Sequence, residues 1–319
     1  MEKKNAMQRL NDLILEKNSR ICAGLDPTLE NIPNVLKEVY GYENRVFCKG
    51  DEAFFRLMRD YCETYIQAIC DVVPAIKINS AFFEQYALEN LYQIIAGEAK
   101  KAGLFVISDV KRADIGNTSA AYAEAFLGKD SPFDAITINP YFGTDGVMPF
   151  LKLAKENGKG VFVLVKTSNK SSAEIQDLEL EDGRKVYEAV ADLLLKWAEE
   201  VNPEVIDEID EFSMVGAVVG ATHPKEAEKL VNRMGDVLCL VPGYGAQGAT
   251  ADDVAVYFDY QGLGGIINSS RGIMNAYKKD CWKDHYSEET WAEAARAEAI
   301  RATEEINQAI NKYFGLEIC

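Results

Sequence analysis

The sequence predicts an α/β protein in which eight parallel strands close into a (β/α)8 barrel, the TIM-barrel architecture. Eight short apolar segments recur along the 319 residues, helical patterns separate them, and polar or charged residues follow several of the segments. In such barrels the carboxyl ends of the strands and the loops after them carry the active site. This placement of polar residues favours the barrel over the alternative, an open doubly wound sheet. Because 48% of the residues are hydrophobic, we expect one large core and a single domain over residues 1–319.

The expected strands are short runs of mostly apolar residues, at 21–25, 75–79, 104–110, 135–139, 161–165, 214–219, 238–241 and 265–268. Helical patterns lie between them, for example at 120–127 and 186–199. Residues 27–51, which are rich in polar and aromatic side chains, and residues 170–183, which are dense in serine and acid, are expected to be loop insertions. Residues 288–313 have strong helix composition, and their alanine stripe predicts a C-terminal helix that packs on the barrel.

A charge cluster follows the third expected strand, with the sequence DVKRAD at 109–114. Because side chains alternate along a strand, Asp109 and Lys111 should point the same way, with Asp114 in the loop beyond. Two flanking carboxylates favour a protonated lysine, whereas a lysine that forms imines needs a lowered pKa. Lys111 is therefore expected to act as an acid that stabilises a carbanion and then protonates it. A structural ion pair at the strand end is the alternative, and this segment alone leaves it open.

Two loops near the end of the chain have the composition of a phosphate site. The sequence PGYGAQG follows the seventh strand at 242–248, and NSSRG follows the eighth at 268–272. Glycines allow backbone N–H groups to approach an anion, and the Arg271 guanidinium can bind two oxygens at once. The loops after these two strands often bind phosphate in (β/α)8 barrels. A flexible connector and a surface arginine remain the alternative, because glycine-rich loops alone are weak signals.

Composition excludes several other classes of function. A net charge of −17 argues against nucleic acid or an anionic membrane as a partner. With two histidines and no C-x-x-C pair among seven cysteines, a zinc site is not expected, and the odd cysteine count suits a reducing compartment. The first 20 residues are charged and amphipathic and do not resemble a signal peptide, and no apolar run reaches the ~18 residues of a membrane span. We therefore expect a cytoplasmic protein.

Taken together, these motifs resemble the orotidine 5′-phosphate decarboxylase family. Five residues match its D-x-K-x-x-D-I-x-x-T signature, namely Asp109, Lys111, Asp114, Ile115 and Thr118. The other matching segments occur in the family's order along the chain: GLDP with Asp26, IKIN with Lys77 and Asn79, TSN with Ser168, the 242–248 loop and Arg271.

The resemblance implies a dimeric barrel that converts orotidine 5′-phosphate to UMP and carbon dioxide, the last step of de novo pyrimidine nucleotide synthesis, without metal or organic cofactor. Lys111 would be the proton donor to C6, and Asp109, Lys77 and Asp114 would complete a charged array. The resemblance also implies that Asp114, Ile115 and Thr118 reach across the dimer into the neighbouring site.

The same resemblance implies the substrate contacts. Asp26, Lys77 and Asn79 would contact the ribose, and Arg271 the phosphate. Ser168 and Gln247 would contact the pyrimidine or the closed loop that begins at Pro242. Ser270 departs from the glycine that many relatives have before the arginine, so a backbone contact there is retained with altered geometry.

Three rival functions stay open at this point. A sugar-phosphate decarboxylase or aldolase can share the D-x-K-x-x-D core, but such enzymes usually work with a metal, and Ile115 with Thr118 favours the nucleotide. A phosphosugar isomerase would keep the phosphate loops without needing an ammonium between carboxylates. A noncatalytic nucleotide-binding module would bind UMP without turnover. A hydrolase triad has no support, because Ser168 has no histidine near it in the sequence.

Overall fold

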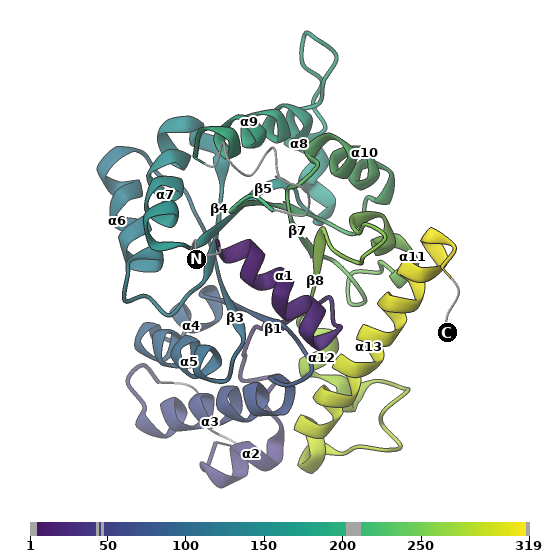
Figure 1. Ribbon diagram of the computed structural model, residues 1–319. Coiled ribbons are helices and arrows are strands. Elements are labelled where there is room, and N and C mark those ends of the chain that lie inside the picture. Colours follow the sequence, from purple (N-terminus) through teal and green to yellow (C-terminus); the bar gives the residue numbers. More distant parts are fainter. Residues whose placement is uncertain (1–4, 43–44, 46–47, 202–211, 317–319) are drawn as a thin grey trace.

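The computed structural model of the protein describes residues 5–42, 45, 48–201 and 212–316. Eight parallel strands pair in chain order, and β8 pairs with β1 to close the barrel (Figure 1). The strands are β1 (Ile21–Leu25), β2 (Ala75–Asn79), β3 (Phe105–Arg112), β4 (Ala135–Ile138), β5 (Gly160–Lys166), β6 (Val215–Val219), β7 (Cys239–Pro242) and β8 (Gly265–Ser269). The predicted (β/α)8 barrel is confirmed, and the open-sheet alternative is wrong.

Helices connect the strands and form the outer layer. The α-helices are α1 (Ala6–Lys17), α2 (Asn34–Val39), α3 (Glu52–Ile69), α4 (Ala81–Glu84), α5 (Glu89–Lys101), α6 (Gly116–Leu127), α7 (Thr144–Asn157), α8 (Ala173–Gln176), α9 (Val186–Val201), α10 (Pro224–Met234), α11 (Ala251–Val254), α12 (Arg271–Met274) and α13 (Trp291–Phe314). Short 3₁₀ turns are η1 (Pro140–Phe142), η2 (Lys170–Ser172), η4 (Ala255–Tyr257), η5 (Ala276–Lys278) and η6 (Glu288–Thr290). In the described part of the chain, no helix is both long enough and apolar enough to cross a bilayer.

The barrel has one core inside the strands and another between the strands and the helices. The inner core includes Phe105, Ile107 and Phe162, and the apolar face of α1 packs against it through Met7 and Leu10. Figure 1 shows α1 lying across the barrel opening. Because α1 covers the amino ends of the strands, the opposite end is left for the polar residues that follow them.

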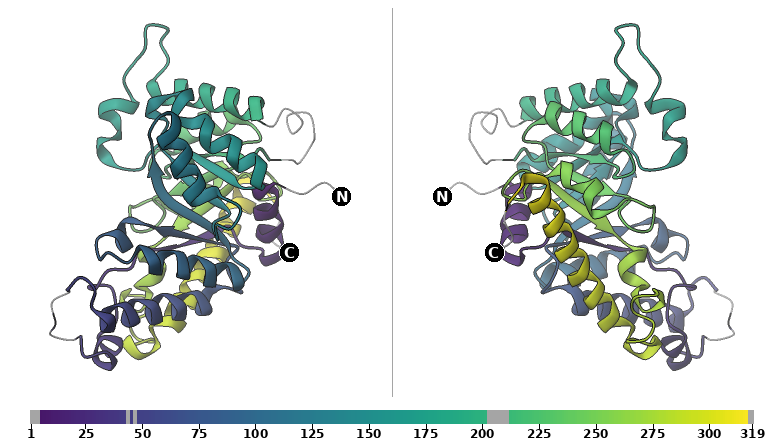
Figure 2. Two further views of the ribbon diagram at one scale, coloured as in Figure 1. Left: turned by 90° about the vertical axis from the view of Figure 1, so that its left-hand side faces the viewer. Right: turned by 90° about the vertical axis from the view of Figure 1, so that its right-hand side faces the viewer.

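The C-terminal helix forms as predicted and packs against α3, α11 and α12. Its side chain Glu298 is 2% exposed and accepts hydrogen bonds from Lys279, Trp282 and Arg301. This helix therefore ties the segment after β8 to the outer layer of the barrel (Figure 2).

Both predicted insertions lie outside the strand and helix repeat. Residues 27–51 contain α2, and four of their residues, at 43–44 and 46–47, lie outside the described part. Residues 170–183 contain η2 and α8 and continue into a hairpin in which Glu179 pairs with Lys185, and this hairpin projects from the barrel (Figure 2). Lys166 at the end of β5 is fully buried and pairs with Asp177 at 2.7 Å, so the second insertion is attached to the end of that strand.

Candidate active site

The carboxyl ends of the strands surround a cavity of about 390 Å³. Polar side chains from different strands meet there because alternate residues of each strand point into the barrel. Nine of the predicted site residues line this cavity: Asp26, Lys77, Asp109, Lys111, Ser168, Pro242, Gln247, Ser270 and Arg271. Among its charged side chains are three cations and two carboxylates, so the cavity offers local positive charge within a chain of net charge −17.

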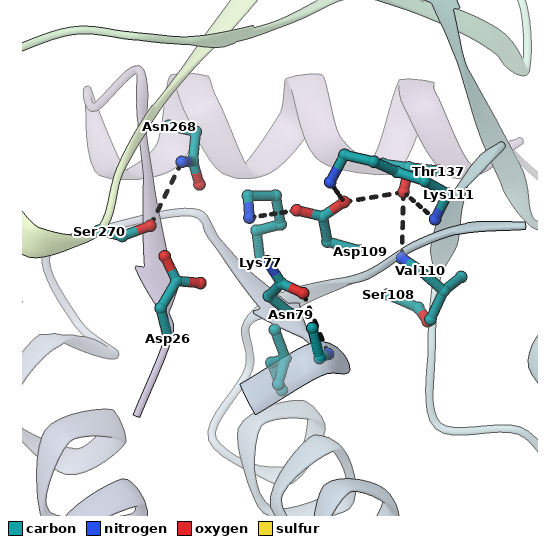
Figure 3. Close-up of polar contacts among 12 residues, drawn as sticks. Asp26, Lys77, Asn79, Ser108, Asp109, Val110, Lys111, Thr137, Asn268 and Ser270 are labelled. Atoms are coloured by element: carbon teal, nitrogen blue, oxygen red, sulfur yellow. Dashed lines mark hydrogen bonds and ion pairs between the residues drawn. The ribbon is translucent and has the colours of Figure 1, made fainter. Parts of the chain in front are cut away.

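A charged array of three residues lies at the base of the cavity (Figure 3). The Lys77 ammonium donates to Asp109 Oδ2 at 2.6 Å, and the Lys111 ammonium donates to Asp109 Oδ1 at 2.5 Å. Asp109 and Lys77 are only 5% and 6% exposed, whereas the Lys111 side chain is half exposed to the cavity. Asp109 is therefore shared between two ammonium groups, whereas Asp114 is not part of this array within one chain.

The environment keeps this buried pair ionised. Burial by itself raises the pKa of the Asp109 carboxyl, but the neighbouring Lys77 and Lys111 charges outweigh burial and hold this pKa below its usual range. Burial likewise disfavours the charged form of Lys77, but Asp109 and then Asp26 outweigh it and raise the pKa of Lys77. Both groups are thus charged at neutral pH.

Lys111 occupies a backbone conformation that the strand pattern did not predict. Its φ is +45°, in the left-handed region that lysine rarely adopts, and the β3–β4 register shifts between Ser108 and Arg112. The backbone N–H groups of Val110 and Lys111 donate to the Thr137 hydroxyl at 3.1 and 3.0 Å. β3 therefore ends in a bulge, which alternation alone does not reveal.

A second polar group lies across the cavity from the charged array (Figure 3). Asp26 follows β1, and its Oδ1 atom is buried with no hydrogen-bond partner in the described structure. Asn268 in β8 is 8% exposed and donates to Ser270 Oγ at 3.4 Å, while its own Oδ1 has no described partner. These oxygens can accept hydrogen bonds from hydroxyl or N–H groups of a ligand.

Ser270 fits beside β1 because position 24 is glycine. A Cβ atom on Gly24 would lie 1.8 Å from Ser270 Oγ, so the serine side chain occupies space that any larger residue at 24 would fill. The departure from glycine at 270 is thus matched by the absence of a side chain on the neighbouring strand.

The loops after β5, β7 and β8 complete the cavity wall. Ser168 lies against the loop after β7, where Gly243 has a φ of +111° and a Cβ atom would approach Ser168 Cβ to 3.3 Å. Tyr244 lines the cavity, but its hydroxyl donates to Glu305 of α13 at 2.5 Å, so this tyrosine also anchors the loop. In the described structure no acidic side chain pairs with the exposed Arg271 guanidinium, which leaves it available for an anion.

Four predicted site residues do not line the cavity of their own chain. Asn79, the last residue of β2, accepts a hydrogen bond at 3.2 Å from the backbone N–H of Ala81, the first residue of α4. Asp114 accepts from Ile115 N at 2.8 Å, and Ile115 is 54% exposed. Thr118 is exposed on the first turn of α6.

Two polar strand residues that line the cavity were not among the predicted site residues. Thr137 lies in the inward-facing position of the segment AITI, and Asn268 lies in the inward-facing position of GIINS. Both are polar side chains in otherwise apolar strands, close to the carboxyl end. That pattern was a usable signal, because a buried polar group in a barrel strand needs a partner. Among the described residues, no group of three His, Cys, Asp or Glu side chains is arranged to hold a metal ion.

Sequence comparisons with known proteins agree with the resemblance that the motifs predicted. Residues 19–280 match the model of the orotidine 5′-phosphate decarboxylase / HUMPS family. An orotidine 5′-phosphate decarboxylase of Rhodopirellula baltica is 39% identical over 306 residues, which cover 93% of this chain and 97% of that protein. The enzyme of the same name from Clostridium tetani is 40% identical over 299 residues, covering 93% and 96% of the two chains.

Solved structures show the same similarity in three dimensions. A structure of the Leishmania donovani OMP decarboxylase matches with a TM-score of 0.70 and 30% identity, covering 96% of this chain and 99% of that one. The match therefore includes the strands and loops that surround the cavity.

Proposed function

The chain belongs to the orotidine 5′-phosphate decarboxylase / HUMPS family, and from this membership and the cavity we propose that it converts orotidine 5′-phosphate to UMP and carbon dioxide, with Lys111 as the proton donor to C6. This reaction is the last step of de novo pyrimidine nucleotide synthesis. The observation that carries the proposal is the Asp109 carboxylate held between the ammonium groups of Lys77 and Lys111 at the base of the cavity. The proposal covers residues 1–319 as one decarboxylase domain, and it includes a cytoplasmic location, which the odd cysteine count suits.

The array matches the charge that develops in the reaction. When carbon dioxide leaves C6, the electron pair of the broken bond stays in the plane of the ring, where the π-system cannot delocalise it. An ammonium placed beside C6 stabilises that carbanion and then transfers a proton to it. Asp109 holds the Lys111 ammonium in place at 2.5 Å, and Lys77 balances the carboxylate from the other side.

A single ammonium does not supply the whole effect. A unit charge pair at 4 Å contributes about 4 kcal/mol at an effective dielectric of 20, against the roughly 8–23 kcal/mol by which enzymes lower barriers. Contacts far from C6 supply the rest by holding the substrate against the array. Arg271 binds the phosphate in this proposal, and closure of the loop from Pro242 through Gln247 excludes water.

The remaining cavity residues orient the nucleotide. We assign the ribose to Asp26 and Lys77 of the cavity and to Asn79 at the end of β2, which lies outside the cavity lining, and the pyrimidine or the closed loop to Ser168 and Gln247. Ser270 contributes its backbone beside the phosphate. The unpartnered Asp26 Oδ1 supports the ribose assignment, because a ribose hydroxyl would give this buried oxygen a donor.

The proposal includes a homodimer with shared sites. Asp114, Ile115 and Thr118 do not line the cavity of their own chain. Ile115 is exposed, as are two aromatic residues of η1, Tyr141 (81%) and Phe142 (50%). Gly146 touches both segments, since its Cβ position lies 2.8 Å from Asp114 O and from Phe142 Cβ. A second copy of the chain would cover this apolar face and bring Asp114 to the neighbouring charged array, where it would add a carboxylate beside Lys111.

Turnover of the substrate tests the proposal directly. Protein treated with a chelator is mixed with orotidine 5′-phosphate, and the ultraviolet spectrum is followed as orotidine 5′-phosphate becomes UMP. We expect complete conversion without added metal, which separates this activity from metal-dependent sugar-phosphate decarboxylases and aldolases, from phosphosugar isomerases and from noncatalytic binding. An unchanged spectrum would reject the proposed function.

The Lys111→Ala variant tests the proton donor. Loss of a positioned proton donor lowers kcat by about 10²- to 10⁴-fold, and we expect at least this loss because the ammonium also stabilises the carbanion. The matched control is Lys152→Ala, which removes an exposed lysine from α7 and should leave kcat unchanged. Equal kcat values for Lys111→Ala and the wild type would remove Lys111 from the mechanism.

A further inference from the structure

We propose that Thr137 is a positioning residue whose hydroxyl fixes both Asp109 and the backbone of Lys111 for proton transfer. This inference rests on the proposed decarboxylation and adds to it a residue from β4. Thr137 is 1% exposed and lines the cavity, but its hydroxyl acts through its neighbours.

The strand register places Thr137 alone opposite three residues of β3. Ser108 pairs with Ile136 and Arg112 pairs with Ile138, so Asp109, Val110 and Lys111 lie between two pairs that only Thr137 separates on β4. The additional residues of β3 cannot all pair with backbone groups of β4. The N–H groups of Val110 and Lys111 donate to Thr137 Oγ1 instead, at 3.1 and 3.0 Å.

The hydrogen-bonding capacity of a hydroxyl then fixes the direction of its proton. A threonine hydroxyl has one donor and two acceptor positions. Two N–H groups occupy the acceptor positions, so the single O–H points to Asp109 Oδ1, at 2.9 Å (Figure 3). The oxygen that accepts from Thr137 is the same one that accepts from the Lys111 ammonium.

This arrangement supports a costly conformation where the chemistry occurs. Lys111 has a φ of +45°, which is unfavourable for a residue with a Cβ atom and persists only when its surroundings hold it. The Thr137 hydroxyl binds the Lys111 N–H on one side and the carboxylate that holds its ammonium on the other. Both ends of the proton donor are therefore positioned by one atom.

The main ground-state contacts of the nucleotide come from other elements. The proposed phosphate ligand Arg271 begins α12, and Asp26 follows β1. Loss of the Thr137 hydroxyl should therefore lower kcat much more than it lowers the affinity for the nucleotide. That difference separates a positioning role from a general contribution to folding.

The test compares Thr137→Val and Thr137→Ala, which lack the hydroxyl, with Thr137→Ser, which keeps it. Wild-type turnover of orotidine 5′-phosphate is measured first, since an inactive wild type would reject the proposed function rather than this inference. We expect the Val and Ala variants to lose about 10- to 100-fold in kcat, the range for a hydrogen bond to a charged group. The Ser variant should stay within about 3-fold of the wild type. The affinity for UMP, measured by titration calorimetry, should change little in all three.

The matched control is Ser108→Ala, which removes a buried hydroxyl from β3, the strand that carries Asp109 and Lys111. Ser108 is fully buried and faces Tyr92 of α5 at 2.7 Å, away from the cavity. Loss of the Ser108 hydroxyl should lower the unfolding temperature of the protein without lowering kcat. Wild-type kcat in Thr137→Val or Thr137→Ala would overturn the proposal, as would a loss in kcat/KM explained by weaker UMP binding alone. Failure of both hydroxyl-free variants to fold would assign Thr137 a structural role and would also overturn it.

Discussion

At the scale of single residues, the cations of the cavity differ in how far the protein itself neutralises them. Lys77 and Lys111 both bind Asp109, so this one carboxylate partly offsets their two charges before a ligand arrives. Arg271 has no acidic partner among the described residues and lies at the cavity edge. This difference suits a division of roles, in which the paired lysines act at the reacting carbon and the unpaired arginine binds the distant anion.

The Arg271→Ala variant tests this division by comparing two ligands that differ only in the phosphate. We expect its affinity for UMP to fall by roughly 10- to 100-fold, because a charge-assisted hydrogen bond to phosphate is lost. The affinity for uridine should stay the same, because uridine has no group for the guanidinium to bind. Titration calorimetry measures both. If the affinities for UMP and uridine fell by the same factor, Arg271 would support the cavity wall and would not bind the phosphate.

At the scale of elements, α13 connects the outside of the barrel to the loops around the cavity. Its Glu305 accepts the Tyr244 hydroxyl of the loop after β7, and its Glu298 binds Lys279 and Trp282 of the segment after β8. Burial raises the pKa of Glu298, but hydrogen bonds from Arg301, Lys279 and Trp282 outweigh burial and lower it below its usual value. The helix is therefore attached through a carboxylate that must stay ionised.

The Glu298→Gln variant tests this attachment through the pH dependence of stability. Since the pKa of Glu298 is lowered on folding, its contribution is present above the unfolded value of about 4.3 and is lost as the pH falls through the folded value. We expect the variant to lose about 1.5–3 kcal/mol in the free energy of unfolding at pH 7, as for hydrogen bonds to a charged group. The difference from the wild type should narrow below about pH 4. Urea denaturation of the variant and the wild type, at pH 7 and below about pH 4, measures this difference in the free energy of unfolding.

The control for this experiment is Glu293→Gln, on the exposed face of the same helix. It should lose little stability at either pH, because an exposed carboxylate without partners gains little from its charge. If Glu298→Gln lowered the free energy of unfolding by the same amount at both pH values, the shape of the side chain would matter at this position and its charge would not.

At the scale of the whole molecule, the array within one chain carries two ammonium groups and one carboxylate. Asp114, which the signature places three residues after Lys111, lies outside this cavity and beside the exposed Ile115. A symmetric dimer would bring it to the neighbouring array and would cover the apolar face in the same contact. Assembly and catalysis would then depend on the same segment.

Mixing two inactive variants tests the shared site. Lys111→Ala and Asp114→Ala are each expected to be inactive, and subunit exchange between them creates hybrid dimers with one intact site. Random exchange should restore roughly one quarter of the wild-type activity, because half of the dimers are hybrid and each has one of its two sites intact.

The control mixture contains Lys111→Ala and Asp109→Ala, whose altered residues lie in the same site of the same chain. This mixture should stay inactive, because neither site of a hybrid dimer is complete. A site shared through Asp114 would be ruled out if the two mixtures recovered the same activity, or if the mixture of Lys111→Ala and Asp114→Ala recovered none.

The sequence determined the architecture, and nine of the residues predicted from it line the cavity. The strand ranges differ from the predicted ones by only one or two residues, because eight apolar runs separated by helical patterns leave few ways to bury both faces of the sheet. The alternation of side chains between the two faces of a strand also predicted that Asp109 and Lys111 lie together. Strand-end position likewise placed Asp26, Lys77 and Arg271 at the cavity, since the carboxyl ends of parallel strands converge.

Tertiary structure alone decided how these residues are held. The bulge at Lys111 depends on Thr137 of the neighbouring strand, and the fit of Ser270 depends on Gly24 of another. Asn79 does not line the cavity, and its carboxamide oxygen accepts the Ala81 N–H at the start of α4. Local sequence specifies which face a side chain takes, but hydrogen bonds between strands far apart in the chain set its final geometry, and those partners are fixed only when the barrel closes.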